Sequence, residues 1–272
     1  MAKTVLITGA SSGIGKAAAK YFQAKSWNVA AAMRSPEKET ELTSLSGVKC
    51  FKLDVLDDAS ISTAIREAVS HFGGLDIVVN NAGYGAVGAF EAATKAQVER
   101  QFGTNVFGVM NVVREVLPFF REKKSGIIIN ITSMGGRLTF PLYSLYHATK
   151  WAVEGFTESL RYELTPLGIK VKLIEPGAIK TDFYERSQDL FKKDGLTAYD
   201  DYQTLTMPNM QAAGANAPGP EIVAEMIYTA ATDGSDRLRY AVGSNAPALI
   251  FLRRILPESW FTGIVKSQVE KQ

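Results

Sequence analysis

A glycine-rich turn between an apolar run and a helical stretch constrains the fold of this chain more than any other feature. The run Thr4–Ile7 predicts a buried strand, and Ile14–Lys25 has helical character. The residues that join them are Thr8-Gly9-Ala10-Ser11-Ser12-Gly13-Ile14-Gly15. Such a turn lets the backbone approach a pyrophosphate, and the amino end of the helix offers free N–H groups and a positive dipole end. This beginning is typical of a dinucleotide-binding fold.

Apolar runs and helical stretches then alternate along the chain in units of roughly 30 residues, which is typical of parallel sheets. The further strands predicted are Trp27–Met33, Lys49–Leu53, Leu75–Val79, Ile127–Ile131, Lys170–Ile174 and Leu238–Val242. The further helices predicted are Asp58–Phe72, Lys95–Arg121, about 143–165 and Glu221–Thr232. The expected fold is therefore α/β: a Rossmann-type, doubly wound parallel sheet of about seven strands with helices on both faces. We expect one catalytic domain over residues 1–272.

The alternation stops after Asp182. Residues 185–219 mix charges, aromatic side chains and a run of small residues, and we expect an irregular lid over the substrate at about 185–220. A C-terminal extension at about 244–272 follows. Its segment Ala248–Val265 is apolar and aromatic with interspersed arginines, which favours core or an oligomer surface over a membrane anchor.

Composition excludes several classes of function. The formal net charge of +2 gives no sign of a nucleic-acid or anionic-membrane partner. The single cysteine, Cys50, excludes an internal disulfide and fits a reducing compartment. No apolar run approaches the ~18 residues of a spanning helix, and we expect no metal site. The expected location is cytoplasmic.

A second stretch, Ser133–Lys150, carries candidate chemistry. Ser133 follows the strand Ile127–Ile131, and open parallel sheets bind ligands at the carboxyl ends of their strands. Tyr146 and Lys150 are four residues apart, so they share one helix face. An ammonium beside a phenol favours the phenolate, which prepares the phenol for proton transfer near neutral pH. In isolation, an ordinary surface pair is the commoner explanation of this spacing.

The segment Gly9–Gly13 also fits the G-x-S-x-G pattern of a serine hydrolase. A hydrolase of that kind needs a histidine later in the chain, after an acid. The two histidines are His71 and His147, and His147 belongs to the same predicted helix as Tyr146. We therefore reject this alternative.

Arg34 follows the second predicted strand, at the position where a dinucleotide fold meets the adenosine ribose. An acidic residue there favours NAD, whereas an arginine can bind the 2′-phosphate of NADP. The other explanation is a solvated arginine at a strand end. Together with the glycine turn, Arg34 favours NADP, with NAD the less expected cofactor.

In this order and spacing, the motifs resemble those of the short-chain dehydrogenases/reductases, in their single-domain branch. The resemblance covers residues 3–185 motif by motif. It implies a catalytic tetrad of Asn105, Ser133, Tyr146 and Lys150. It implies a cofactor site made of Gly9, Ser11, Ser12, Gly13, Ile14, Gly15, Arg34, Ser35, Asp54, Val55, Asn80, Asn81, Ala82, Gly83, Pro176, Gly177, Ile179 and Thr181, together with Tyr146 and Lys150. Gly103 departs from the family pattern, so the helix near Asn105 is expected to be softer.

The resemblance implies an NADP(H)-dependent oxidoreductase that interconverts a carbonyl compound and an alcohol. Tyr146 would be the acid or base, Ser133 would orient the carbonyl, and Asn105 would link Lys150 to solvent through water. Two alternatives stay open: a 3-oxoacyl thioester reductase and a non-catalytic NADP-binding sensor. The small-molecule substrate is expected to be hydrophobic, possible pocket residues being Leu138, Phe140, Leu142, Tyr143, Tyr184, Phe191 and Met207. Relatives associate through two long helices, here about 95–121 and 143–165, so a homodimer or homotetramer is expected.

Overall fold

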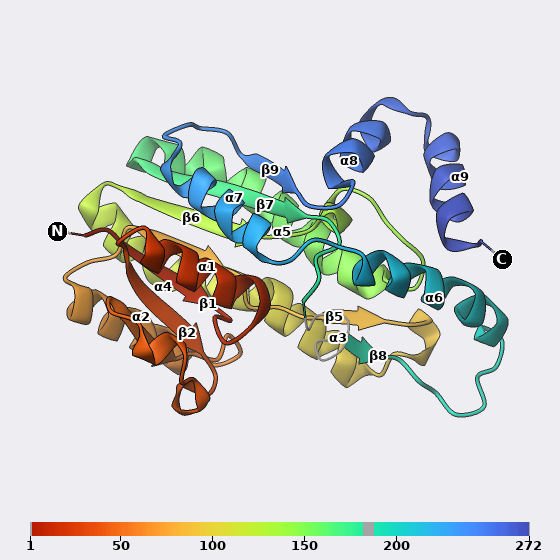
Figure 1. Cartoon of the computed structure of the whole chain (residues 1–272), viewed down its shortest axis with the longest axis horizontal. Coiled ribbons are helices and arrows are strands. Elements are labelled where there is room, and N and C mark those ends of the chain that lie inside the picture. The colour runs from red at the N-terminus through yellow and green to blue at the C-terminus, as the bar shows by residue number, and fades with distance from the viewer. Residues whose placement is uncertain (1, 182–187, 272) are drawn as a thin grey trace.

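The protein is described here by a computed structural model that covers residues 2–181 and 188–271. At its centre lies one parallel sheet of seven strands, in the order β3-β2-β1-β4-β6-β7-β9 (Figure 1). These strands are β1 (Thr4–Thr8), β2 (Asn28–Met33), β3 (Val48–Lys52), β4 (Ile77–Asn80), β6 (Gly126–Ile131), β7 (Ile169–Pro176) and β9 (Arg239–Val242). The predicted doubly wound α/β sheet is confirmed, each strand lying within a few residues of its expected place.

Helices cover both faces of this sheet (Figure 1). The covering helices are α1 (Gly13–Ala24), α2 (Asp58–Phe72), α4 (Gly108–Lys123), α5 (Ser144–Leu164) and α7 (Glu221–Thr232). Successive residues of β1 point to opposite faces, because the side-chain period of a strand is two. Val5 and Ile7 accordingly pack in the core beneath α1 and α7, whereas Leu6 packs with α2, α4 and α5.

The order of the strands places a topological switch between β1 and β4. The chain runs outward from β1 through β2 to β3, then returns to β4 on the other side of β1. The loops after β1 and β4 therefore diverge, and this is where open α/β sheets bind ligands. The two loops are tied together by Thr8, whose hydroxyl oxygen accepts hydrogen bonds from the backbone N–H groups of Asn81 and Ala82, both at 3.0 Å.

The helical stretch expected over Lys95–Arg121 is confirmed, although it is not α-helical throughout. α3 (Lys95–Phe102) passes into a π-helical turn, Gly103–Phe107, before α4 begins. A Cβ on Gly108 would lie 2.8 Å from the Cβ of Val55, so glycine allows a close approach there. A π-turn inserts one extra residue per turn and is frequent at functional sites. Hydrophobic periodicity does not reveal such an insertion.

The segment 185–220 is not irregular over much of its length, so that part of the expectation is wrong, whereas its role as a lid over the substrate stays a prediction. A strand, β8 (Gln188–Leu190), pairs in parallel with β5 (Gly85–Val87), and α6 covers Asp200–Ala215. Tyr184, Arg186 and the start of the predicted lid lie outside the described residues. Helix α6 was missed because its apolar residues do not gather on one face and Pro208 lies inside it. Tertiary contacts stabilise α6 instead. The Asn209 amide donates hydrogen bonds to the carbonyl oxygens of Val269 and Lys271, both at 3.0 Å.

The C-terminal segment forms two helices, α8 (Ala246–Ile255) and α9 (Glu258–Val269), beside α6 (Figure 1). Shorter 3₁₀ helices occur at Pro36–Lys38, Leu42–Ser44, Phe90–Ala92, Met134–Gly136 and Thr165–Leu167. Within residues 2–181 and 188–271, no helix combines the length and apolarity needed to cross a bilayer.

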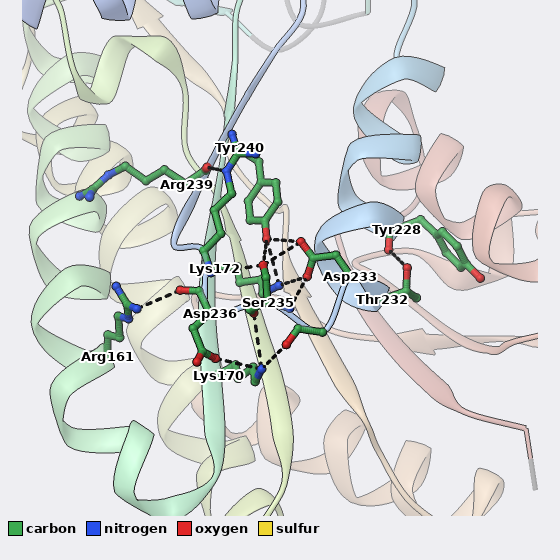
Figure 2. Close-up of polar contacts among 12 residues, drawn as sticks. Arg161, Lys170, Lys172, Tyr228, Thr232, Asp233, Ser235, Asp236, Arg239 and Tyr240 are labelled. Atoms are coloured by element: carbon green, nitrogen blue, oxygen red, sulfur yellow. Dashed lines mark hydrogen bonds and ion pairs between the residues drawn. The ribbon is translucent and has the colours of Figure 1, made fainter.

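A buried polar cluster joins β7 to the β9 edge of the sheet (Figure 2). The Lys172 side chain is 1% exposed, and its ammonium donates hydrogen bonds to Asp233 at 2.6 Å and to the Tyr240 hydroxyl at 3.0 Å. The Tyr240 hydroxyl and Ser235 in turn donate to the same carboxylate. Although burial opposes ionisation of Asp233, these hydrogen bonds hold its pKa well below the usual value. The cluster therefore gives the buried Lys172 ammonium a carboxylate partner that still reaches solvent.

Candidate active site

A cleft of about 1190 Å³ lies at the carboxyl ends of the central strands and receives most of the residues predicted from the sequence. Those lining it are Gly9, Ser11, Ser12, Gly13, Ile14, Arg34, Asp54, Val55, Asn81, Ala82, Gly83, Ser133, Tyr146, Lys150, Pro176, Gly177, Ile179 and Thr181. Gly15, Ser35, Asn80 and Asn105 are not among its lining residues. The fold thus gathers residues from the ends of β1, β2, β3, β4, β6 and β7 and from α5 into one site.

The glycine turn at the start of the cleft depends on the absence of side chains. Gly9 has a φ of +66° and Gly13 a φ of +52°, values that favour glycine. Gly15 serves packing instead, since a Cβ there would lie 2.4 Å from the carbonyl oxygen of Gly9. The Asn81 amide closes the turn by donating to the carbonyl oxygens of Thr8 at 2.9 Å and Gly9 at 3.2 Å. The turn is shaped by its neighbours before any ligand binds.

Arg34 and Asp54 flank the same end of the cleft. Arg34 is exposed at the end of β2, and no hydrogen bond or ion pair of its guanidinium is present among the described residues. Ser35 precedes the 3₁₀ helix Pro36–Lys38 instead of lining the cleft. One Asp54 oxygen accepts a hydrogen bond from the backbone N–H of Leu56 at 3.0 Å, which fixes the direction of the carboxylate.

Tyr146 and Lys150 lie on one face of α5, as their spacing predicts. The Lys150 nitrogen is 5.7 Å from the centre of the Tyr146 ring and donates a hydrogen bond to the Ile131 carbonyl oxygen at 3.0 Å. Burial lowers the pKa of Lys150 to about 8, against the opposing effect of the Glu154 carboxylate. The ammonium and the phenol therefore reach the cleft together, at the end of β6.

Ser133 is oriented from two sides. Its hydroxyl oxygen accepts a hydrogen bond from the Gly135 N–H at 3.0 Å, within the 3₁₀ turn that follows β6. The hydroxyl also lies 3.4 Å from the carbonyl oxygen of Pro176, to which it donates. A serine held at the ends of β6 and β7 in this way has a defined direction toward the cleft.

Asn105 lies behind the cleft, on the π-helical turn, and is 2% exposed. Its amide nitrogen donates to the Tyr84 carbonyl oxygen at 2.9 Å and to the Thr149 hydroxyl at 3.2 Å. Its amide oxygen accepts from the Tyr84 N–H at 3.1 Å. The side chain therefore joins the loop after β4 to the residue that precedes Lys150.

His147 has a positioning role that the sequence reasoning missed. Its Nε2 accepts a hydrogen bond from the Phe140 N–H at 2.9 Å, so its Nδ1 carries the proton that is donated to the Gly135 carbonyl oxygen, also at 2.9 Å. Burial lowers the pKa of His147 to about 4, which keeps the ring neutral. The ring thus ties the loop after Ser133 to α5. In the sequence, only the position of His147 next to Tyr146 indicated that this histidine could position the site.

The half of the cleft away from the glycine turn is built by the C-terminal helices. Its lining residues there include Asn209, Met210, Leu249, Ile264, Gln268 and Val269. Of the predicted apolar pocket, Phe140 and Tyr143 line the cleft, whereas Leu138, Leu142, Phe191 and Met207 do not. Leu138 and Phe191 are core residues, 1% and 4% exposed. The distinction between core and pocket for such side chains depends on tertiary packing.

The fold and the cleft define a dinucleotide-binding protein of the Rossmann type. A family model described as short chain dehydrogenase matches residues 3–190, so the chain belongs to the short-chain dehydrogenase/reductase family. An uncharacterized oxidoreductase of Bacillus subtilis, YusZ, is 37% identical over 277 residues, covering 98% of each chain. The structure of a short-chain dehydrogenase from Streptomyces avermitilis superposes with a TM-score of 0.81 at 34% identity, over 98% of this chain and 93% of that one.

Two further similar structures contain nicotinamide cofactors. ElxO, with NADP bound, has a TM-score of 0.72 at 28% identity, over 89% of this chain and 98% of its own. The 3-ketoacyl-(acyl-carrier-protein) reductase of Brucella melitensis, complexed with NADH, has a TM-score of 0.75 at 27% identity, over 89% and 96%. These neighbours support an oxidoreductase with a nicotinamide cofactor and do not distinguish NADP from NAD.

Proposed function

We propose that the protein is an NADP(H)-dependent oxidoreductase that interconverts a hydrophobic ketone or aldehyde and its alcohol. The observation that carries this proposal is the arrangement of Ser133, Tyr146 and Lys150 along one wall of a cleft that begins at the glycine turn. The glycine turn that leads into α1 fits a pyrophosphate, because the amino end of this helix offers N–H groups that the Ser12 side chain does not cap. We propose that the cofactor is bound by the cleft residues of this turn, of the loop after β4 and of the segment Pro176–Thr181.

The proposed roles follow from where each group lies. When bound, the nicotinamide supplies or accepts the hydride. The Tyr146 hydroxyl gives its proton to the substrate oxygen in reduction and takes it back in oxidation. Lys150 stabilises the phenolate that remains, and Ser133 orients the substrate oxygen by a hydrogen bond. Asn105, held by Tyr84 and Thr149, is proposed to keep a water path open to Lys150.

A panel of ketones and aldehydes tests the proposal. We expect the purified protein to oxidise NADPH with at least one hydrophobic carbonyl compound, followed by the loss of NADPH absorbance. Binding of NADPH without turnover on any member would support the alternative, a non-catalytic sensor. The complete Ser133, Tyr146 and Lys150 set favours an enzyme.

Arg34→Asp is expected to reverse the preference between the two cofactors. Loss of a charge-assisted contact with the 2′-phosphate removes about 1.5–3 kcal/mol, so kcat/KM for NADPH should fall roughly 10- to 100-fold. The ratio of kcat/KM values for NADPH and NADH measures the effect. Lys52→Asp is the matched control, since Lys52 is exposed at the end of neighbouring β3 and outside the cleft lining. An equal change in both variants would attribute the effect to net charge and contradict the proposed contact.

A 3-oxoacyl thioester reductase is the second candidate. It is favoured by the Brucella melitensis neighbour, which is named for that activity. Lys192 and Lys193 are exposed near β8 and would suit an acidic carrier, whereas Arg186 lies outside the described residues. Turnover of 3-oxoacyl thioesters well above that of simple ketones would support this candidate.

We further propose a homodimer or homotetramer in the cytoplasm. Phe107, Trp151 and Tyr162 are 56%, 47% and 76% exposed, on the π-helical turn and along α5. Exposed aromatic side chains of this kind are typical of interfaces. The lone cysteine Cys50 fits a reducing compartment.

A further inference from the structure

Glu154 is a buried carboxylate that has no part in the roles assigned so far. It follows Lys150 by one turn of α5 and is 4% exposed. One carboxylate oxygen accepts a hydrogen bond from the Thr132 hydroxyl at 2.7 Å, and the other accepts from the Arg239 Nε at 2.9 Å. A buried charge is costly unless it is paired, so its retention at this position calls for a physical reason.

Lys150 and Glu154 contact two successive residues at and just after the end of β6, immediately before Ser133. The Ile131 carbonyl oxygen accepts the hydrogen bond from the Lys150 ammonium, Thr132 donates to Glu154, and Ser133 is the proposed orienting hydroxyl. The acid and the amine of one helix face therefore contact adjacent residues, Ile131 at the end of β6 and Thr132 after it. Thr132 is also bound to the Ile174 carbonyl oxygen of β7, through its backbone N–H at 2.8 Å and its hydroxyl at 3.0 Å, so Glu154 and β7 together hold the residue before Ser133.

Glycine in the following loop permits this close packing. A Cβ on Gly136 would lie 2.8 Å from the Cγ of Glu154 and 3.2 Å from the carbonyl oxygen of Lys150. The loop after Ser133 thus passes directly over the turn of α5 that holds both charges. This packing excludes water, and charges interact more strongly where water is excluded.

Several charged groups face Glu154 from neighbouring elements. Arg239 of β9 contacts Glu158 of α5 at 2.5 Å and Glu175 of β7 at 3.5 Å, and Arg137 contacts Glu175 at 3.2 Å. Two arginines thus face Glu154, Glu175 and the half-exposed Glu158. Burial raises the pKa of Glu154, and it raises the pKa of Glu175 to about 7.

On the α5 side, the nearest titratable groups are those of Tyr146, His147 and Lys150. His147 is neutral and directed to the loop, as described above. Desolvation pushes Lys150 toward its neutral amine, and the Glu154 charge acts against it. Glu154 thus does two things: its charge favours the ammonium form of Lys150, and its carboxylate accepts a hydrogen bond from Thr132, the residue before Ser133.

We propose that Glu154 is a positioning residue for the reaction: it keeps Lys150 in the ammonium form and, through Thr132, fixes Ser133 opposite Tyr146. The positioning role in catalysis rests on the proposed function. The electrostatic half of the proposal, the coupling of Glu154 to Lys150, can be measured without any turnover.

The direct test follows the side-chain nitrogen resonance of Lys150 against pH in protein labelled with ¹⁵N-lysine, assigned by its loss in Lys150→Met. In Glu154→Gln we expect the titration midpoint of Lys150 to fall by about one pH unit, since an opposite charge one helical turn away, with both groups buried, changes a pKa on that order. The sign follows because desolvation then acts unopposed, so the ammonium loses its proton at lower pH. Glu158→Gln is the matched control, and its midpoint should stay at the wild-type value. A midpoint that is unchanged or higher in Glu154→Gln overturns the electrostatic half.

Thr132→Val tests the positioning half and removes only a hydroxyl, so it remains informative should Glu154→Gln fail to fold. We expect kcat to fall roughly 10-fold, the scale of one lost hydrogen bond. The alkaline limb of the pH profile of kcat should stay at the wild-type pH. In Glu154→Gln that limb should move to lower pH, together with the Lys150 midpoint. A wild-type kcat in Thr132→Val overturns the positioning half. If the wild-type protein reduces no carbonyl compound, the proposed function fails, while the nitrogen titration still decides whether Glu154 controls Lys150.

Discussion

Tyr146→Phe is expected to lower kcat by a factor of about 10²–10⁴ while NADPH affinity stays near the wild-type value. The substitution removes one oxygen, the group proposed to transfer the proton, and leaves the ring in place. That ring is held by its neighbours, with its centre 6.0 Å from that of Tyr143 and 5.8 Å from that of His147. The wall of the cleft should therefore keep its shape. Steady-state rates at saturating substrate and a fluorescence titration with NADPH measure the two quantities.

Tyr143→Phe is the matched control for this experiment. Tyr143 also lines the cleft and immediately precedes α5, but it lies outside the Tyr-x-x-x-Lys pair. We expect its kcat to change by no more than a few-fold. A Tyr146→Phe protein that turns over at the wild-type rate, or a Tyr143→Phe protein that is equally impaired, would show that the proton comes from another group.

Lys172→Ala is expected to lower the free energy of unfolding by about 1.5–3 kcal/mol, the scale of losing hydrogen bonds that involve a charged group. The variant leaves the Asp233 carboxylate with hydrogen bonds from Tyr240 and Ser235 but without its ammonium partner (Figure 2). Urea unfolding at neutral pH, followed by the far-UV signal, measures the difference. The loss should appear as a lower midpoint with little change in slope.

Lys170→Ala is the control from the same strand. Lys170 pairs with Asp236 at the surface, where side-chain exposures are 38% and 76%, and such pairs contribute about 0–1 kcal/mol. The pH dependence has a defined sign. Because the native pKa of Asp233 lies below its ordinary value, the stabilisation is complete above about pH 4 and is lost as the pH falls toward the native pKa. The difference between wild type and Lys172→Ala should therefore shrink in acid; equal losses in the two lysine variants would contradict the prediction.

Features of this protein that depend on local sequence patterns were predictable, whereas features that depend on tertiary packing were not. Strand β1, the turn Gly9–Gly15 and the spacing of Tyr146 and Lys150 were predictable, because each depends on residues adjacent in the chain or one helical turn apart. The same holds for the seven-stranded parallel sheet, whose alternating runs follow from the burial of both its faces.

Features that depend on distant contacts were missed. Helix α6 has no amphipathic face and depends on Asn209, which contacts the end of α9 some 60 residues later. The π-turn at Asn105 requires an extra residue that no periodic pattern reveals. Leu138 and Phe191 were candidates for the pocket until the packing placed them in the core.

The sequence by itself therefore determined the class of fold, the family and most of the residues that line the cleft. These depend on backbone rules and on motifs whose members are close in the chain. Tertiary structure alone decided which of the candidate apolar residues line the cleft and which buried charges lie next to it. Glu154 is an ordinary helical residue in the sequence. Its partners are Thr132, just after β6, and Arg239, on β9, and only folding brings these groups together where water is excluded.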